Sequence, residues 1–458
     1  MKNMTLAAIA AACNGQLYYE EKATDVSAEA TQVIIDSRQI IPGGIFIATP
    51  GERVDGHSFI PQVFEKGALG VVCQKLPEVA VGPCILVEDS FQALKDIATF
   101  YRDQLDIKVV GITGSVGKTS TKEFIASVLE QKYDIWKTQG NYNNEIGVPL
   151  TILQVRENHQ ILVLEMGINH FGEMTRLSAI GRPDVAVITN IGQCHLEFLG
   201  DRDGVLKAKT EIFTSMAKDG VVILNGDDDK LVTIKEVNGS RPIFFGRNDG
   251  CEYFPAQSKS EGLFGTQVVL SDRKDGSTIK ALVPLPGEHM VNNAMAAMAV
   301  GEVFGLNGEE IRCGIEAVKA TGGRSNIIKG ERYTIIDDCY NANPTSMMAA
   351  IDLLNTANTT KVAILGDMFE LGENEKELHA EVGRYAAASG IEVLICIGEL
   401  SKNMYDAACE EQTAMTYYYV DKESAIAALD NILQGNDSIL VKASHSMGFE
   451  KIVDFLQQ

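Results

Sequence analysis

The chain has 458 residues and a formal net charge of −22, with 45% hydrophobic and 22% charged residues. At roughly 150 residues per domain, this length predicts about three globular domains. The acidic balance argues against nucleic acid as the main ligand, because a phosphate backbone needs a basic surface. A small anionic ligand held by a few local groups remains compatible with it.

The nine cysteines are scattered without CxxC or CxxH pairs. This spacing favours reduced thiols in a cytoplasmic protein over a disulfide framework or a zinc site. No apolar stretch reaches the ~18 residues that span a membrane. We therefore expect a cytoplasmic monomer, with neither nucleic acid nor membrane among its partners.

Residues 1–86 are predicted to form a small α/β domain. The short, Ala-rich run near the N-terminus fits a capped helix from about Thr5 to Gly15 better than a signal peptide. Two β-rich runs joined by Pro-Gly-Gly follow, and then a helix and a further strand.

Residues 87–319 and 320–458 are predicted to form two larger α/β domains. In the first, the apolar runs IKVVGI, ILVLEMG, DVAVITNIG and GVVILNGDD alternate with helical stretches. Such continuous runs are typical of a mostly parallel sheet covered on both faces. The last region repeats strand and helix, which predicts a second doubly wound, Rossmann-like sheet.

The stretch GITGSVGKTSTKEF is the strongest functional signal. It departs from the spacing G-x-x-x-x-G-K-[ST], because Ile112 stands where the first glycine belongs. Gly114 and Gly117 remove side chains from the approach of a phosphate, Lys118 could contact the outer phosphates, and Thr119 could bind Mg²⁺. The alternative is a tight turn that binds nothing, but a strand–loop–helix context favours a nucleotide.

Two residues follow neighbouring strands on the crevice side of the central sheet. Glu165 ends the apolar run ILVLE, and an acidic residue there suits Mg²⁺, although a helix cap or an ion pair remains an alternative. His195 comes just after the strand that ends near Asn190. Its residue type alone indicates a structural histidine, and its position indicates the site.

Two further pairs of side chains have competing interpretations. By themselves, Lys207 and Lys209 in GVLKAKTEIF indicate a solvated helix face. The chemical alternative is that a buried, neutral lysine amine takes up CO₂ and becomes a carbamate, an oxygen ligand for a metal. Asn292 and Asn293 could contact a nucleobase, but helix capping is the favoured alternative.

The third predicted domain has its own candidates. Arg324 follows two glycines at the domain junction, where it could stabilise a phosphoryl group or form a rim salt bridge. Asp337 and Asp338 end one strand, and one of them is expected to cap while the other faces the crevice. Asp367 in LGDMFELG ends another strand at the same edge.

Eight strings together resemble the Mur ligases: TGSVGKTSTKEF, TQGNYNNEIGVPLTIL, LEMGINHFGEM, NIGQCHLEFLG, LKAKTEIF, GEHMVNNAMAA, DDCYNANPTSM and LGDMFELG. They occur in the family's order and span essentially the whole chain. T-G-S-x-G-K-T is similar to the family's own phosphate loop. The Gly-Asn-Tyr-Asn-Asn-Glu-Ile-Gly and Tyr-Asn-Ala-Asn strings look like the MurF type, which joins D-alanyl-D-alanine to UDP-N-acetylmuramoyl-tripeptide.

The resemblance implies a role for each domain. The first would bind the UDP end of the sugar-nucleotide substrate, the central one would bind ATP, and the last would lie on the dipeptide acceptor side. The residues implied for the ATP site are Gly114, Ser115, Val116, Gly117, Lys118, Thr119, Ser120, Asn292, Arg324 and Asp338. The residues implied for the UDP-muramoyl substrate are Ser37, Arg38, Asn141, Asn143 and Asn144.

The resemblance also implies two Mg²⁺ ions and a carbamate. Thr119 and Glu165 would hold magnesium, and a second ion would be organised by Glu165, His195 and Lys209 as its carbamate. The AKTEIF string matches the family's carbamate position at Lys209 rather than Lys207. The residues implied for catalysis are Lys118, Lys209, His195 and Arg324.

The implied reaction is ATP-dependent amide synthesis through an acyl phosphate in peptidoglycan precursor synthesis. The alternatives are a sister ligase that adds one amino acid, a folylpolyglutamate synthetase-like ligase, and an ATP-operated binding protein without ligation. One position departs from the MurF pattern. His445 in VKASHSMGFEKIV stands where an arginine is expected, which leaves the dipeptide contacts unassigned.

Overall fold

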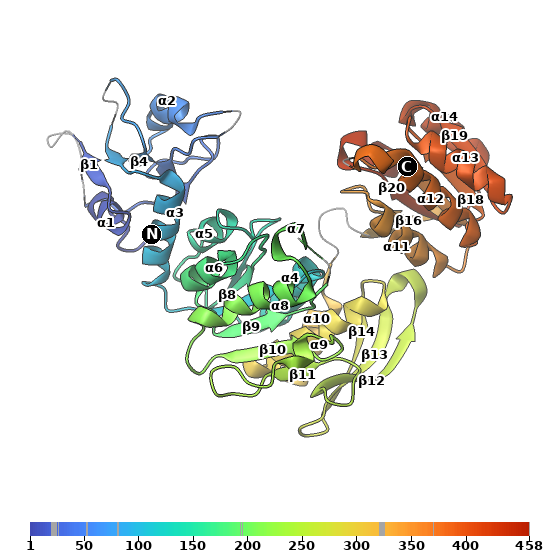
Figure 1. Ribbon diagram of the computed structural model, residues 1–458, viewed down its shortest axis with the longest axis horizontal. Coiled ribbons are helices and arrows are strands. Elements are labelled where there is room, and N and C mark those ends of the chain that lie inside the picture. Colours follow the sequence, from blue (N-terminus) through green and yellow to red (C-terminus); the bar gives the residue numbers. More distant parts are fainter. Residues whose placement is uncertain are drawn as a thin grey trace. The chain divides into compact units, whose positions relative to one another are not determined.

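The computed structural model describes residues 1–19, 25, 27–51, 54–79, 82–192, 194, 196–319, 326–369 and 371–457. Its strands form three sheets, and helices alternate with the strands along the chain, which confirms the predicted α/β class (Figure 1). The chain groups into two compact units. The first contains Met1–Ala256, Leu270–Ile279 and Asn292–Ile315, and the second contains Gln257–Val269, Lys280–Val291 and Glu316–Gln458. The domain boundaries after residues 86 and 319 stay predictions.

The N-terminal sheet has five strands in the order β1-β5-β4-β3-β2, of which β1 and β5 pair antiparallel and the other pairs are parallel. Its strands are β1 (Gln16–Tyr18), β2 (Val33–Ile34), β3 (Ile45–Ile47), β4 (Gly70–Cys73) and β5 (Cys84–Leu86). Its helices are α1 (Leu6–Ala12), η1 (Gly56–Phe59) and α2 (Ile60–Glu65), and α3 (Ser90–Arg102) follows. The predicted N-terminal helix is confirmed, because Thr5 Oγ1 accepts a hydrogen bond from Ala8 N and caps α1.

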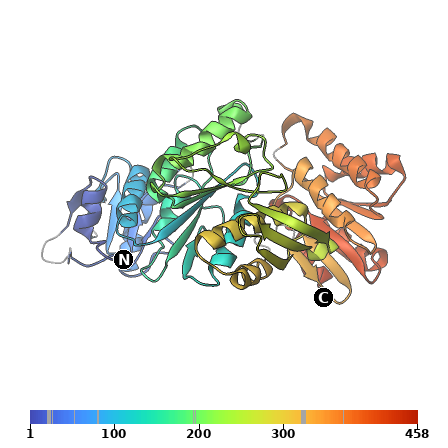
Figure 2. The ribbon, with the colours of Figure 1, turned by 90° about the horizontal axis from the view of Figure 1, so that it is seen from below.

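The central sheet has nine strands in the order β14-β13-β12-β11-β10-β9-β6-β8-β7. Its strands are β6 (Lys108–Thr113), β7 (Ile135–Lys137), β8 (Ile161–Glu165), β9 (Val185–Ile188), β10 (Val221–Asn225), β11 (Ile243–Phe245), β12 (Tyr253–Ser260), β13 (Thr266–Asp272) and β14 (Thr278–Val283). The strands from β7 to β12 pair in parallel. The yellow-green strands β12 to β14 lie side by side at one end of this sheet (Figures 1 and 2).

Helices connect the strands of the central sheet, and two more helices, α9 and α10, follow its last strand. They are α4 (Lys118–Leu129), α5 (Gly147–Ile152), α6 (Glu173–Gly181), α7 (Leu196–Leu199), α8 (Arg202–Thr210), η2 (Glu211–Ser215), η3 (Leu231–Thr233), η4 (Gly262–Phe264), α9 (Glu288–Val303) and α10 (Gly308–Glu316). All five residues of β8 are buried, as expected for a strand covered on both faces. Parallel strands end at one edge of a sheet, so the loops after β6, β8 and β9 gather there.

The C-terminal sheet has six strands in the order β15-β16-β20-β17-β18-β19. Its strands are β15 (Asn326–Lys329), β16 (Tyr333–Asp337), β17 (Lys361–Gly366), β18 (Val393–Ile397), β19 (Met415–Tyr419) and β20 (Asp437–Lys442). Only the β15–β16 pair is antiparallel among the described strands of this sheet. Its helices are α11 (Pro344–Asn355), η5 (Gly372–Asn374), α12 (Glu375–Ala388), α13 (Ser401–Glu411), α14 (Lys422–Ile432), η6 (His445–Met447) and α15 (Glu450–Leu456).

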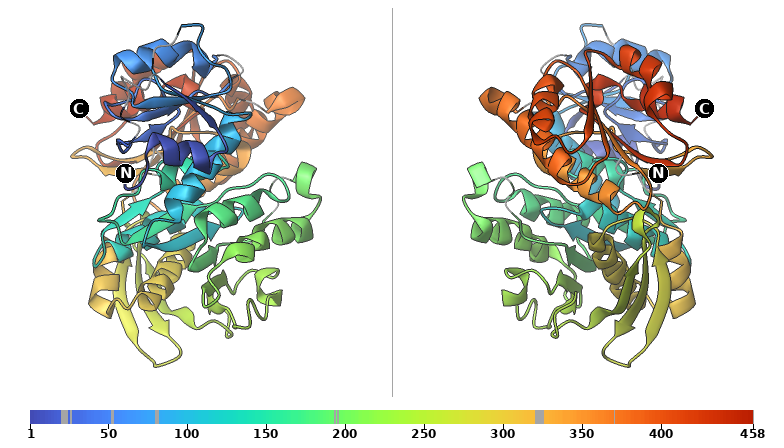
Figure 3. Two further views of the ribbon diagram at one scale, coloured as in Figure 1. Left: turned by 90° about the vertical axis from the view of Figure 1, so that its left-hand side faces the viewer. Right: turned by 90° about the vertical axis from the view of Figure 1, so that its right-hand side faces the viewer.

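Two apolar clusters cover the two faces of this C-terminal sheet. Residues of α11, α12 and α13 pack on one face, and residues of α14 and α15 pack on the other. The orange and red helices can be followed on both sides of the sheet in Figure 3. The predicted doubly wound arrangement is therefore confirmed.

All nine cysteines are free thiols, as their spacing predicts. Among the described residues, no helix has both the length and the hydropathy to cross a bilayer.

Candidate active site

The loop between β6 and α4 has the backbone geometry of a phosphate cradle. Gly114 has φ +153°, and a Cβ placed on it would lie 1.9 Å from Thr189 Oγ1. Gly117 has φ +83° and immediately precedes α4 without offering a side-chain cap. Both positions therefore require glycine, and the helix N-terminus is left open toward an anion.

The loop that follows β9 holds the phosphate loop in place. Ser115 N donates to Asn190 O over 3.0 Å, and Val116 N donates to Asn190 Oδ1 over 2.9 Å. Thr189 Oγ1 donates to Val116 O over 2.6 Å. These bonds fix the loop before any ligand binds, which reduces the entropy that binding must remove.

Lys118 lies across the loop that it follows. Its Nζ donates to Gly114 O over 2.9 Å and lies 3.5 Å from Ser115 O. The ammonium group is thereby held against the backbone of the loop, and its contact with the outer phosphates stays a prediction.

Glu165 is the buried acidic residue beside the loop, with 1% of its surface exposed. Its Oε1 accepts hydrogen bonds from Thr119 Oγ1 over 3.2 Å and from Asn143 Nδ2 over 2.8 Å. Its Oε2 is buried and has no hydrogen-bond partner among the described residues. The structure thus brings Thr119 and Glu165 together and leaves one carboxylate oxygen unsatisfied.

Sequence reasoning missed Lys122, which lies behind this carboxylate. Lys122 is 1% exposed, and its Nζ lies 3.8 Å from Glu165 Oε2 and 3.1 Å from Glu123 Oε1. It also donates to Thr138 O over 2.8 Å. The spacing could have indicated it, because Lys122 is three residues after Thr119 and so lies on the same helix face.

The two lysines of α8 have different environments. Lys207 is exposed and lies 5.7 Å from the centre of the Phe171 ring, so the solvated-face interpretation is confirmed for it. That interpretation is wrong for Lys209, which is 1% exposed. Burial, and then the charge of Lys118, lower the pKa of Lys209 to about 8. A neutral amine is therefore accessible near neutral pH, as carbamate formation requires.

The donors fit the metal that the sequence predicts. Thr119 and Glu165 offer a hydroxyl and a carboxylate whose Oε2 accepts no hydrogen bond among the described residues, and Mg²⁺ prefers such oxygen ligands. A carbamate on Lys209 would add two more oxygens. The described part of the chain contains no group of three or more His, Cys, Asp or Glu side chains suited to a metal. His195 lies outside the described residues.

The three asparagines predicted to line the muramoyl side differ in exposure and in hydrogen-bond partners. Asn141 is exposed, and Asn143 bonds to Glu165. Asn144 Oδ1 accepts from Ile146 N over 3.1 Å and from Gly147 N over 2.9 Å, and so caps the start of α5.

The residues predicted for the UDP side lie in the N-terminal sheet region. Ser37 is buried, and its carbonyl accepts from Lys66 Nζ over 2.9 Å. Arg38 has an 87% exposed side chain that forms two hydrogen bonds to Asp36, of 2.9 and 2.8 Å. The Arg38 guanidinium holds the pKa of Asp36 at about 2.

In the second turn of α9, Asn293 lies beside the phosphate loop. Asn293 Oδ1 accepts from Thr121 Oγ1 over 2.9 Å and would lie 3.8 Å from a Cβ placed on Gly117. Asn292 Oδ1 is buried and has no hydrogen-bond partner among the described residues. The adenine contact assigned to Asn292 stays a prediction, and its unsatisfied amide oxygen is compatible with it.

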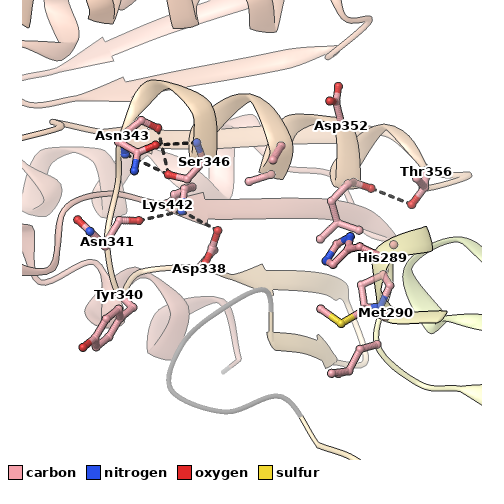
Figure 4. A pocket seen from close by; sticks show the side chains of 16 residues that line it. His289, Met290, Asp338, Tyr340, Asn341, Asn343, Ser346, Asp352, Thr356 and Lys442 are labelled. Atoms are coloured by element: carbon pink, nitrogen blue, oxygen red, sulfur yellow. Dashed lines mark hydrogen bonds and ion pairs between the residues drawn. The ribbon is translucent and has the colours of Figure 1, made fainter. Parts of the chain in front are cut away.

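In the second unit, a cavity of about 600 Å³ lies at the strand ends of the C-terminal sheet (Figure 4). Asp338, 8% exposed, lines it and accepts a hydrogen bond of 2.6 Å from Lys442 Nζ. Lys442 also donates to Asn341 O over 2.8 Å. Sequence reasoning missed Lys442, although a lysine ending the apolar run SILVK carries the same signal as an acid there.

The other described candidates of this domain have their own contacts. Asp367 is buried and accepts from Ser401 N and Oγ over 2.7 and 2.6 Å, which makes it a structural carboxylate. The His445 side chain is 72% exposed and lies 3.2 Å from Glu450. Asp337 accepts a weak bond of 3.4 Å from Cys339 N. Arg324 lies outside the described residues.

Comparison with known proteins identifies the family. Three family models match: "Mur ligase family, catalytic domain" over residues 29–102, "Mur ligase middle domain" over 112–301 and "Mur ligase, glutamate ligase domain" over 323–445. The UDP-N-acetylmuramoyl-tripeptide–D-alanyl-D-alanine ligase of Bacillus subtilis is 39% identical over 92% of this chain and 92% of its own.

Two solved structures are similar over almost the full length. A crystal structure of MurF from Acinetobacter baumannii has a TM-score of 0.88 and 32% identity, and covers 99% of both chains. The MurF ligase from Thermotoga maritima in complex with ADP has a TM-score of 0.77 and 28% identity, and covers 93% of this chain and 97% of its own. The chain therefore belongs to the Mur ligase family, in its MurF-type branch.

Proposed function

We propose that the protein is an ATP-dependent ligase that joins D-alanyl-D-alanine to UDP-N-acetylmuramoyl-tripeptide. The observation that carries this proposal is the phosphate loop with a buried carboxylate at its side, namely Lys118 over the loop and Glu165 bonded to Thr119. The names of full-length relatives supply the substrates.

The reaction has two steps. The tripeptide carboxylate attacks the γ-phosphorus of ATP. The bond between this phosphorus and the β,γ-bridging oxygen breaks, ADP departs, and an acyl phosphate is formed. The dipeptide amine then attacks the acyl carbon, phosphate leaves with the C–O bonding pair, and the amine gives up a proton to solvent. A carboxylate is a poor electrophile, so this activation is what makes the amide bond accessible.

The protein contributes position and charge. The open N-terminus of α4 orients the phosphates, and Lys118 stabilises the negative charge that develops on the γ-phosphoryl oxygens. Both reacting substrates are anionic, which explains a cationic centre in a protein of net charge −22.

Thr119 and Glu165 would hold Mg²⁺, and His195 and carbamylated Lys209 would complete a second magnesium site. Magnesium in these positions would neutralise phosphate charge and orient the transferring group. Carbamate formation needs no reactant other than CO₂. The neutral Lys209 amine bonds to the carbon of CO₂, and one proton leaves to solvent. Burial favours this, because it disfavours the ammonium form.

The remaining assignments are part of the same proposal. Asn292 and Asp338 contact the nucleotide, Arg324 stabilises phosphoryl charge, and Ser37 and Arg38 lie on the UDP side. The unsatisfied oxygen of Asn292 and the cavity lined by Asp338 support the first two. The protein acts as a monomer in the cytoplasm.

The test is a coupled phosphate-release assay with UDP-N-acetylmuramoyl-tripeptide, Mg²⁺, ATP and a panel of acceptors. We expect release with D-alanyl-D-alanine and little with single amino acids or glutamate. Equal or faster release with a single amino acid would indicate a sister ligase. ATP binding without release for any acceptor would indicate an ATP-operated binding protein.

A further inference from the structure

Helix α8 carries Lys209 near its C-terminal end and passes directly into η2. The first residue of η2 is Glu211, two residues after Lys209 and half-buried.

The Glu211 carboxylate makes four hydrogen bonds to the first turn of another helix, α6. Gly172 N lies 3.1 Å from Oε1 and 3.0 Å from Oε2. Thr175 donates to Oε2 through its backbone N over 3.2 Å and through Oγ1 over 3.0 Å. A side chain that follows α8 is thus joined to the N-terminus of α6.

Helix α6 needs this external carboxylate. Its N-cap is Gly172, with φ +81° and no side chain to accept a bond from the first turn. The first amides of a helix have no partner inside the helix, and the helix dipole favours negative charge there. Glu211 therefore supplies, from a distant element, the cap that Gly172 does not provide.

The segment that this cap fixes leads directly from the candidate metal ligand. Strand β8 ends at Glu165, and the chain then runs through residues 166–172 into α6. Glu211 thus ties the segment after Glu165 to the end of the helix that carries Lys209. At the other end of α8, Arg202 Nε donates to Ile191 O over 2.9 Å in the loop after β9.

Two hydrogen bonds between uncharged groups also join α6 to η2. Ser178 Oγ, in the middle of α6, donates to Ile212 O over 2.7 Å and accepts from Ser215 N over 3.3 Å. Ser178 therefore contributes to packing η2 on α6 but does not cap the helix.

We propose that Glu211 is a positioning residue: by capping α6 it holds the end of α8 in place, so that the Lys209 amine stays buried beside the phosphate loop. This inference rests on the proposed function only where it concerns the carbamate of Lys209. The position of the amine itself is independent of that chemistry.

The first experiment measures the position of the amine. The full-length protein and the variants Glu211→Ala, Glu211→Gln and Ser178→Ala are reductively methylated in CO₂-free buffer, and methylation of Lys209 is followed by peptide mass spectrometry. We expect Glu211→Ala to raise the rate about fivefold or more, as for loss of one helix cap, with a smaller rise in Glu211→Gln. Ser178→Ala should stay near the wild-type rate even where it lowers the melting temperature.

The second experiment measures the carbamate by ¹³C NMR of protein equilibrated with ¹³C-bicarbonate, together with kcat at increasing bicarbonate. We expect Glu211→Ala to lose most of the carbamate signal and to recover kcat as bicarbonate rises. Ser178→Ala should keep the signal and a bicarbonate-independent kcat.

The outcomes distinguish the carbamate on Lys209 from the positioning role of Glu211. A wild-type protein without any carbamate signal contradicts the carbamate in the proposed function, and the methylation rates then decide the role of Glu211 alone. Equal methylation of Lys209 in the wild type and in Glu211→Ala overturns the positioning role. Equal increases in Glu211→Ala and Ser178→Ala overturn it too, because they indicate general loosening.

Discussion

Asn143 donates a hydrogen bond through Nδ2 to Glu165 Oε1, at 2.8 Å, although the two residues are 22 positions apart in the chain. Asn143 O in turn accepts from Gly167 N over 2.7 Å, just after β8. The asparagine-rich loop is thus attached both to the strand-end carboxylate and to the backbone that follows it. Its bond to Glu165 orients Oε1, and Oε2, which accepts no hydrogen bond among the described residues, is the oxygen proposed to bind a metal.

We expect Asn143→Ala to raise the Mg²⁺ concentration needed for half-maximal ligation by about tenfold, because groups that orient a metal ligand typically carry that much of the affinity. Steady-state rates against Mg²⁺, and Mn²⁺ binding followed by electron paramagnetic resonance, measure it. The neighbouring Asn144→Ala is the control. It removes the α5 cap, so it should cost about 1 kcal/mol of stability and leave the Mg²⁺ midpoint unchanged. An unchanged midpoint in Asn143→Ala would contradict the orienting role.

Lys118→Ala should lower dipeptide-dependent ADP release by at least about a hundredfold, since it removes the cation of the phosphate loop that we propose stabilises the transferring phosphoryl group. Coupled ADP detection at saturating substrates measures this. Lys207→Ala removes an exposed lysine of the same charge and should keep nearly full turnover. Normal turnover in the Lys118 variant would refute the function assigned to the loop.

Lys442→Met should reduce the free energy of unfolding by roughly 3 kcal/mol, because it removes the buried cation of the Lys442–Asp338 ion pair. Urea denaturation measures the change. The double variant Asp338→Asn/Lys442→Met should recover part of the loss. Lys259→Met breaks an exposed pair with Glu261 and should change stability by less than about 1 kcal/mol. A loss no larger than in this control would show that the buried pair does not contribute as argued.

Glu302 accepts a hydrogen bond of 2.8 Å from Tyr253 Oη, and burial, with the nearby Asp272, raises the pKa of Glu302 above its usual 4.5. A raised carboxyl pKa means that the folded state binds the proton more tightly than the unfolded state. The resulting stability is present below pH 4.5 and is lost as pH rises through the folded pKa.

Glu302→Gln removes that ionisation, so the variant should gain melting temperature over the wild type at about pH 8 and show less gain at about pH 5. Differential scanning calorimetry across this range tests it. The exposed Glu331→Gln makes the same change in charge and should show a small difference that varies little with pH. A gain for Glu302→Gln that increases toward acid would reverse the assigned direction of the shift.

The sequence by itself determined the local features of the site. Glycine spacing, an apolar strand before it and an amphipathic helix after it predict the loop at Gly114 and Gly117, since positive φ angles and strand–helix order are short-range properties. The acid at the end of β8 was predicted for the same reason. Parallel strands end at one edge, so Glu165 had to lie near the loop.

The tertiary structure decided which of two similar side chains is buried. Lys207 and Lys209 differ by two positions. The AKTEIF string favours Lys209 by resemblance, but residue type and spacing alone do not rank the two lysines, because their exposure depends on what packs against α8. Likewise Asn293, not Asn292, bonds to Thr121, which lies 172 residues away.

Tertiary packing also decided two pairings of buried charges. It brings Lys442 to Asp338, 104 residues away, and Lys122 to Glu165. A buried charge is tolerated only where long-range contacts bring its partner within a few ångströms, and local sequence does not encode that distance.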